Sequence, residues 1–137
     1  MDLADAAPTA GVLACVALLL VLAAPFVLIA DPGTGLAVYY ASGALGVAGV
    51  GFLAALLVIV FLSAKQERRA ADTVAGVALV ASVGLLALAL AWALAVDVQN
   101  LYSFPASASW IVWHRWLVVG VSAVVPLSAA AYARAVL

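Results

Sequence analysis

Four polar residues in this chain have the types needed for a small binding site: Asp31, Asp97, His114 and Arg115. If they lie together, they could bind a small anion or a lipid head group, with His114 as a pH-sensitive member. The alternative is structural: the guanidinium of Arg115 forms an ion pair with Asp97 and ties a loop to a helix. The sequence leaves both interpretations open.

Other chemistry has little support in the sequence. There is no nucleophile with a neighbouring base, no carboxylate pair and no phosphate-binding glycine loop, because the glycines between residues 43 and 51 lie in a continuous apolar run. One histidine cannot supply the ligands of zinc or of a six-coordinate haem. The single cysteine, Cys15, fits a small buried hydrophobe and cannot form an intramolecular disulfide. We therefore expect no enzyme activity, no metal and no cofactor.

The elements that position these residues are long apolar runs. The chain has 137 residues, of which 70% are hydrophobic and 8% charged, whereas soluble domains are roughly half apolar and about a quarter charged. Each run meets the length of about 20 residues that crosses a bilayer. The sequence predicts an all-α membrane protein, a single bundle of four transmembrane helices at about 10–30, 36–64, 73–96 and 109–134. The acidic start, with Asp2 and Asp5, argues against a cleaved signal peptide.

Charge in the short loops predicts the orientation. Lys65, Arg68 and Arg69 follow the second run and Arg134 closes the fourth, and the side rich in Lys and Arg is usually cytoplasmic. We expect two helical hairpins in the cell membrane with both termini inside. Most aromatic residues then fall at the outer end, where they would form an interfacial girdle: Tyr39, Tyr40, Trp92, Tyr102, Phe104, Trp110, Trp113 and Trp116.

Small residues and prolines suggest where helices pack and bend. The second helix has a stretch of small residues that suits close packing, either within the chain or against a second copy. This stretch contains Ser42, Gly46 and Gly51. Pro25 and Pro126 each free a backbone carbonyl that must find another partner. A tolerated kink is the simpler interpretation, and a hinge or an ion-coordinating break is the alternative.

Two short stretches carry a resemblance. Residues 103–107, Ser-Phe-Pro-Ala-Ser, with Trp110 and the run His114-Arg115-Trp116, and the closing run Ala129–Arg134, resemble small uncharacterised four-helix membrane proteins of haloarchaea. The resemblance covers most of the chain. It implies an archaeal origin and a four-helix architecture, and it carries over no functional residue.

The function expected from the sequence is a non-enzymatic small subunit or scaffold of a membrane assembly. Its partners would be the lipid bilayer and other membrane subunits or further copies of itself, and the net charge of −1 gives no reason to expect nucleic acid. The alternative is a small oligomeric transporter or channel, or a lipid- or anion-binding protein, that uses Asp31, Asp97, His114 and Arg115. A cofactor-binding redox subunit would need ligands from another chain.

Overall fold

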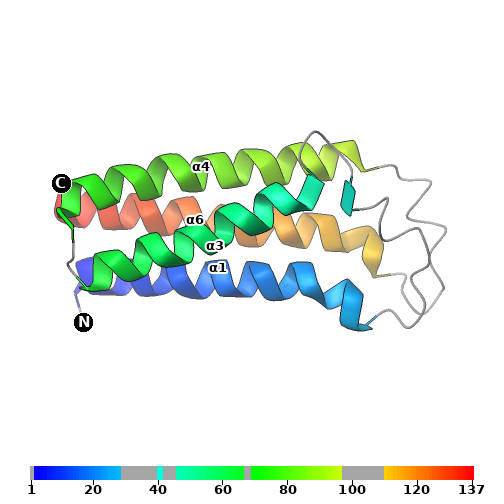
Figure 1. Cartoon of the computed structure of the whole chain (residues 1–137), viewed down its shortest axis with the longest axis horizontal. Coiled ribbons are helices and arrows are strands. Elements are labelled where there is room, and N and C mark those ends of the chain that lie inside the picture. Colours follow the sequence, from blue (N-terminus) through cyan, green and yellow to red (C-terminus); the bar gives the residue numbers. More distant parts are fainter. Residues whose placement is uncertain (1, 29–39, 42–45, 67–68, 97–109) are drawn as a thin grey trace.

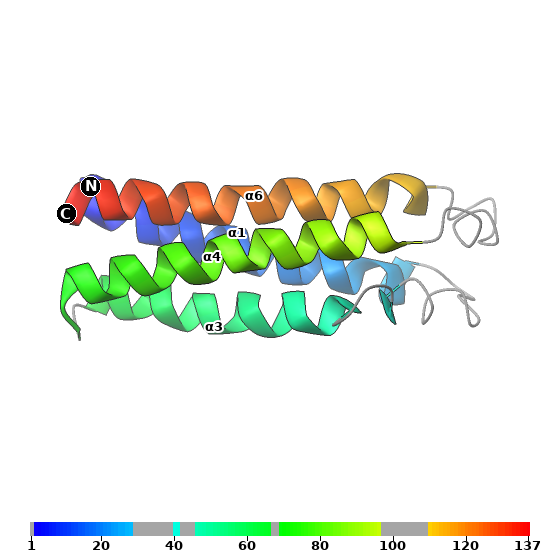
Figure 2. The same ribbon diagram turned by 90° about the horizontal axis from the view of Figure 1, so that it is seen from above.

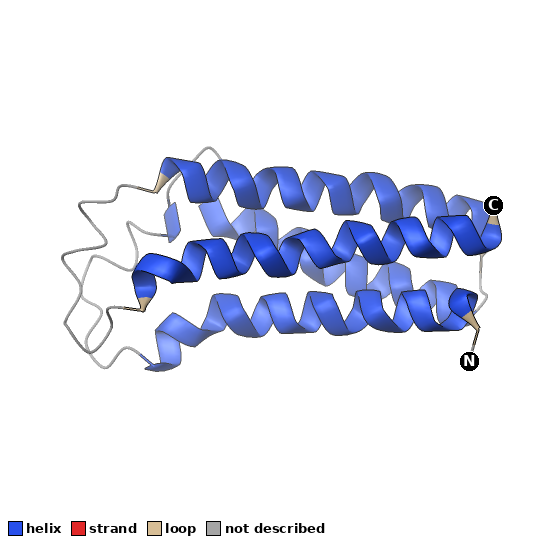
Figure 3. Ribbon diagram, turned by 180° about the vertical axis from the view of Figure 1, so that it is seen from behind, coloured by secondary structure: helices blue, strands red, loops and turns tan. Residues whose placement is uncertain are grey.

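The protein is described by a computed structural model covering residues 2–28, 40–41, 46–66, 69–96 and 110–137. Within these ranges all regular secondary structure is helical (Figure 3). The long helices are α1 (Leu3–Leu28), α3 (Gly46–Gln66), α4 (Ala71–Ala95) and α6 (Ile111–Val136), and Tyr40 and Ala41 are also helical. The prediction of an all-helical chain with four long apolar helices is confirmed.

The helices run up and down in one elongated bundle (Figure 1). Each packs against two others, in the order α1, α3, α4, α6 and back to α1, and Figure 2 shows the same arrangement from above. Both termini lie at one end, with the end of α3 and the start of α4; we call this the terminal end. The opposite end holds His114, the end of α1 and the end of α4, and we call it the histidine end.

The helices are long enough and apolar enough to cross a bilayer. They contain 21 to 26 residues, which at 1.5 Å per residue gives about 32 to 39 Å, against about 30 Å of hydrocarbon. Large apolar side chains are exposed on all four helices, among them Leu13, Leu20, Phe52, Ile59, Val80, Leu94 and Leu127. A helix that is apolar on every side is typical of a membrane span.

Helix α1 begins earlier than the sequence suggested. The carboxylate of Asp2 accepts a hydrogen bond from the backbone N–H of Asp5 at 3.1 Å, which is the geometry of an N-terminal cap. Thr9 lies inside the helix, and its hydroxyl donates to the carbonyl of Asp5 at 3.0 Å. Ala70 occupies the N-cap position of α4, and Asp72 lies in the first turn of that helix.

The expected second helix, residues 36–64, is interrupted at Gly46. This glycine has φ 61° and begins α3, and left-handed backbone of this kind favours glycine because other side chains clash there. A Cβ atom on Gly46 would also lie 2.6 Å from the carbonyl oxygen of Tyr40. Gly46 therefore shapes the entry to α3, close to the backbone of Tyr40.

Side chains fill the interior from end to end. The core includes Leu18, Leu57, Phe61, Leu85, Trp92, Val118 and Val125. Two of the buried serines bond to their own helices: Ser82 donates to the carbonyl of Leu79 and Ser128 to that of Val124, both at 3.0 Å. Such bonds are a usual way of satisfying a hydroxyl inside an apolar helix bundle.

Candidate functional site

The histidine end contains the half of the predicted polar cluster that the structure describes. His114 and Arg115 lie in the first turns of α6, one buried and the other half-buried. Asp31 and Asp97 lie outside the described residues, so the ion pair between Arg115 and Asp97 stays a prediction. The environment of the two described residues can be followed atom by atom.

His114 reaches across the bundle to α1. Its side chain is 2% exposed, and its Nε2 lies 2.7 Å from the carbonyl oxygen of Val21. Since a carbonyl only accepts, Nε2 carries the proton and donates. Val21 is four residues before Pro25, which has no N–H to close the helical bond to that carbonyl. His114 therefore supplies the donor that Pro25 removes.

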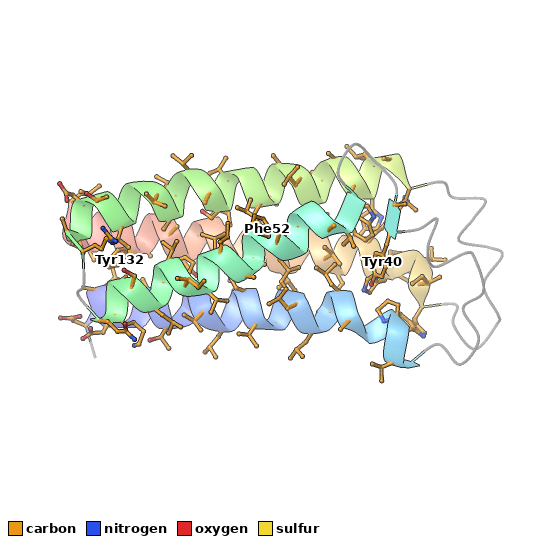
Figure 4. The ribbon with its side chains drawn as sticks, in the orientation of Figure 1. Tyr40, Phe52 and Tyr132 are labelled. Carbon is orange, nitrogen blue, oxygen red and sulfur yellow. The ribbon has the colours of Figure 1, made fainter. Side chains whose placement is uncertain are left out.

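Tyr40 binds the next carbonyl at the same break. Its hydroxyl donates to the carbonyl oxygen of Leu22, and Figure 4 shows Tyr40 at the histidine end, far from Tyr132 at the terminal end. Two adjacent carbonyls of α1, those of Val21 and Leu22, thus accept from side chains outside α1. The bond to Val21 satisfies the carbonyl that Pro25 leaves without its helical donor, and a buried carbonyl without a donor is costly. We call this arrangement of His114, Tyr40 and Pro25 the proline clamp.

Aromatic rings surround the His114 imidazole. The ring centroids of Tyr40, Trp92 and Trp110 lie 6.2, 6.4 and 5.9 Å from that of His114, and all three meet the imidazole edge to face at 67° to 86°. Tyr40 and Trp92 also contact each other at 5.9 Å. Edge-to-face contacts of this kind are favourable between aromatic rings. The rings hold the imidazole in position against α1.

Arg115 binds the end of α4. Its Nη1 donates to the carbonyl oxygens of Ala93 at 3.1 Å and Val96 at 3.5 Å, and its guanidinium lies 5.1 Å from the ring centroid of Trp116. The last carbonyls of a helix lack helical partners, and a cation there complements the helix dipole. The Nε of Arg115 is buried and has no hydrogen-bond partner among the described residues. Arg115 therefore ties α6 to α4.

The expected aromatic girdle is wrong for two residues. Trp92 is 1% exposed and Tyr40 7% exposed, because their rings pack around His114 rather than at a lipid interface. Trp113 and Trp116 are exposed as a girdle requires. The sequence did contain a signal for the buried group: the carbonyl freed by Pro25 needs a polar partner, and only residues such as Tyr and His can bring one into an apolar core.

Glycine packing also differs from the expectation. Ser42 lies outside the described residues, Gly46 serves a turn, and a Cβ on Gly51 would meet nothing within 4 Å. The chain itself therefore does not use Gly51 for close packing, and packing against a second copy stays a prediction. The close approach is at Gly11, where a Cβ would lie 2.6 Å from the ring of Phe61. Sequence reasoning missed Gly11, although Ala7 lies four residues before it, because small residues recur at this spacing throughout the apolar runs.

Three pockets at the terminal end share Arg69 in their linings. They measure about 410, 280 and 270 Å³. The sequence pointed to this end only through the basic loop that contains Lys65 and Arg69. Lys65 donates to the hydroxyl of Thr9 at 2.6 Å, which joins α3 to α1. No group of three side chains suited to binding a metal lies together in the part of the chain that the structure describes.

The fold and these contacts define a class: a four-helix bundle whose helices are apolar enough to span a membrane and whose buried polar side chains mostly bond to backbone carbonyls. The chain belongs to a family of unknown function, DUF7548, whose model matches residues 1–137. No curated protein matches the chain. No solved structure matches it either.

Proposed function

We propose that the protein is an integral membrane protein with four transmembrane helices and both termini in the cytoplasm. One observation carries this proposal: large apolar side chains are exposed on all four long helices. In water such a surface would drive aggregation, whereas in a bilayer it is covered by lipid. The basic residues Lys65, Arg69 and Arg134 at the terminal end favour that end as the cytoplasmic one. The resemblance to haloarchaeal membrane proteins supports an archaeal cell membrane.

We further propose that its role is that of a non-enzymatic subunit or scaffold. Three of the four buried polar residues favour this role, because His114, Ser82 and Ser128 bond to backbone carbonyls. Groups committed in this way brace the bundle and are poorly placed to bind or move a substrate. The hydroxyl of the fourth, Ser122, has no hydrogen-bond partner among the described residues. The oligomeric transporter or channel remains the competing function, since its path would lie between copies.

Purification separates these functions. The full chain, expressed in its native membrane with an affinity tag, is solubilised in a mild detergent, and the captured material is identified by mass spectrometry. Stoichiometric foreign membrane subunits are expected for a subunit or scaffold. A homo-oligomer without other subunits would contradict that role and favour the transporter. An absorption spectrum of the same sample tests for a haem held with a partner.

A further inference from the structure

The pockets at the terminal end converge on one arginine. The largest is lined by Ile59, Leu62, Ser63 and Gln66 of α3 together with Arg69. A second lies between α3 and α4 and shares Ile59, Ser63 and Arg69 with the first. Two hollows along α3 therefore share three lining residues, and Arg69 lines both of them.

The groove between α3 and α4 combines two kinds of surface. Its walls are apolar and its end is polar: Ile59, Val60, Val74 and Val77 form the walls, and Ser63, Thr73 and Arg69 the polar part. From Gln66 to Ile59 the helix rises about 10 Å, at 1.5 Å per residue. No hydrogen bond or ion pair engages the Arg69 side chain within the described ranges, and Arg69 is exposed.

We propose that this groove binds an anionic phospholipid. The phosphate binds the Arg69 guanidinium, a charge-assisted contact that arginine forms well, and one acyl chain lies against Ile59, Val60 and Val77. The proposal rests on the proposed membrane insertion, which places the ends of α3 and α4 at the level of the lipid head groups. An anionic cytoplasmic leaflet attracts basic residues at this level.

The apolar walls favour a lipid over a free anion. Inorganic phosphate would use Arg69 and leave Val60, Val77 and Ile59 without a role. The third pocket also contains Arg69, but Asp5 lines it as well, and a carboxylate repels a phosphate. Among the described residues, the lining of the groove between α3 and α4 includes no acidic side chain, so its charge matches an anionic head group better.

The test counts lipids that stay bound. The full-length protein is delipidated in mild detergent, reconstituted into nanodiscs of equal phosphatidylglycerol and phosphatidylcholine, and released for native mass spectrometry. Wild type is expected to retain phosphatidylglycerol preferentially. Arg69→Gln should lower that retention about fivefold, the usual effect of one basic residue near an anionic surface. Val77→Trp should lower it similarly by filling the groove.

Matched variants separate a site from general attraction. Arg134→Gln removes the same charge at the same end, and Val80→Trp adds the same ring to α4; neither residue lines the three pockets. Both should retain lipid as wild type does. Equal losses in Arg69→Gln and Arg134→Gln, displacement of the lipid by inorganic phosphate, or unchanged retention in Val77→Trp would each overturn the proposal. Alkaline extraction of the source membranes tests insertion separately, since an integral protein stays in the pellet whether or not the groove binds lipid.

Discussion

A proline in a membrane helix leaves a carbonyl oxygen that lipid cannot satisfy. In this protein the carbonyl of Val21 receives its hydrogen bond from His114, 93 residues away in sequence. The same residue was a candidate for anion binding, yet its Nε2 proton is committed to the backbone. At the scale of single residues, the first role of His114 is therefore to donate a hydrogen bond to a helix carbonyl that has lost its own donor.

Replacing the imidazole by a ring without a donor tests this role. His114→Phe keeps an aromatic side chain of similar size but leaves the Val21 carbonyl unpaired, so we expect a loss of about 1 to 2 kcal/mol in the free energy of unfolding. The measurement is reversible unfolding in mixed micelles. Trp113→Phe, one residue earlier and exposed, is the control and should unfold like wild type. A His114→Phe protein as stable as that control would contradict the proline clamp.

Gly11 supplies a second test at a single position. Gly11→Ala places a methyl group 2.6 Å from the buried Phe61 ring, and overpacking of this kind costs about 1 to 3 kcal/mol. Gly120→Ala adds the same methyl group where nothing lies within 4 Å, and it should be neutral or slightly stabilising. The same unfolding assay compares them. Adding Phe61→Leu should recover part of the stability of Gly11→Ala; no recovery would mean that the ring is not the obstacle.

Sequence reasoning reached some of these residues and missed others for physical reasons. That Pro25 frees a carbonyl follows from the chemistry of proline alone. Which side chain donates to that carbonyl depends on how α6 is rotated about its axis relative to α1. An apolar sequence with little helical periodicity does not indicate that rotation. The same difficulty affected the glycines, because Gly11 and Gly51 differ only in what the fold places opposite them.

At the scale of the helix, the clamp predicts a coupling between α1 and α6. Pro25→Ala restores a backbone N–H that can bond to Val21, so His114 is no longer needed as a donor. We expect the cost of His114→Phe, about 1 to 2 kcal/mol in the native background, to fall close to zero in the Pro25→Ala background. A double-mutant cycle in the unfolding assay measures this coupling. Additive effects of the two changes would show that proline and histidine act independently.

The helices themselves were largely predictable, and their ends were not. The four long helices lie in four long apolar runs. Such runs are easy to find, because a length of about 20 apolar residues is a simple threshold to apply to a sequence. Helix α1 starts at Leu3 because Asp2 caps it, although the first uncharged apolar run begins only near residue 10. The second run breaks at Gly46, which has a left-handed backbone. In the sequence this glycine cannot be told apart from the other small residues of the run.

At the scale of the whole molecule, the bundle predicts the position of its ends. The two termini lie at the same end (Figure 1), so a membrane-inserted chain has both on one side. We expect a reporter enzyme that works only in the cytoplasm to be active when it is fused after Leu137. The same reporter fused before Met1 should also be active. One cytoplasmic and one external reporter would contradict the four-span arrangement. Two external reporters would keep the spans and reverse the proposed orientation.

The proline clamp also has a consequence for biosynthesis. Of the four long helices α1 is synthesised first, so until α6 is made the Val21 carbonyl lacks its eventual donor. That donor arrives only with α6, the last of the four long helices in chain order. Helix α1 thus cannot reach its final state until α6 has been synthesised, which makes the joining of α1 to α6 a natural closing step in the assembly of the bundle. In a chain truncated before α6, the Val21 carbonyl would have no donor from His114, a feature that membrane quality control could detect.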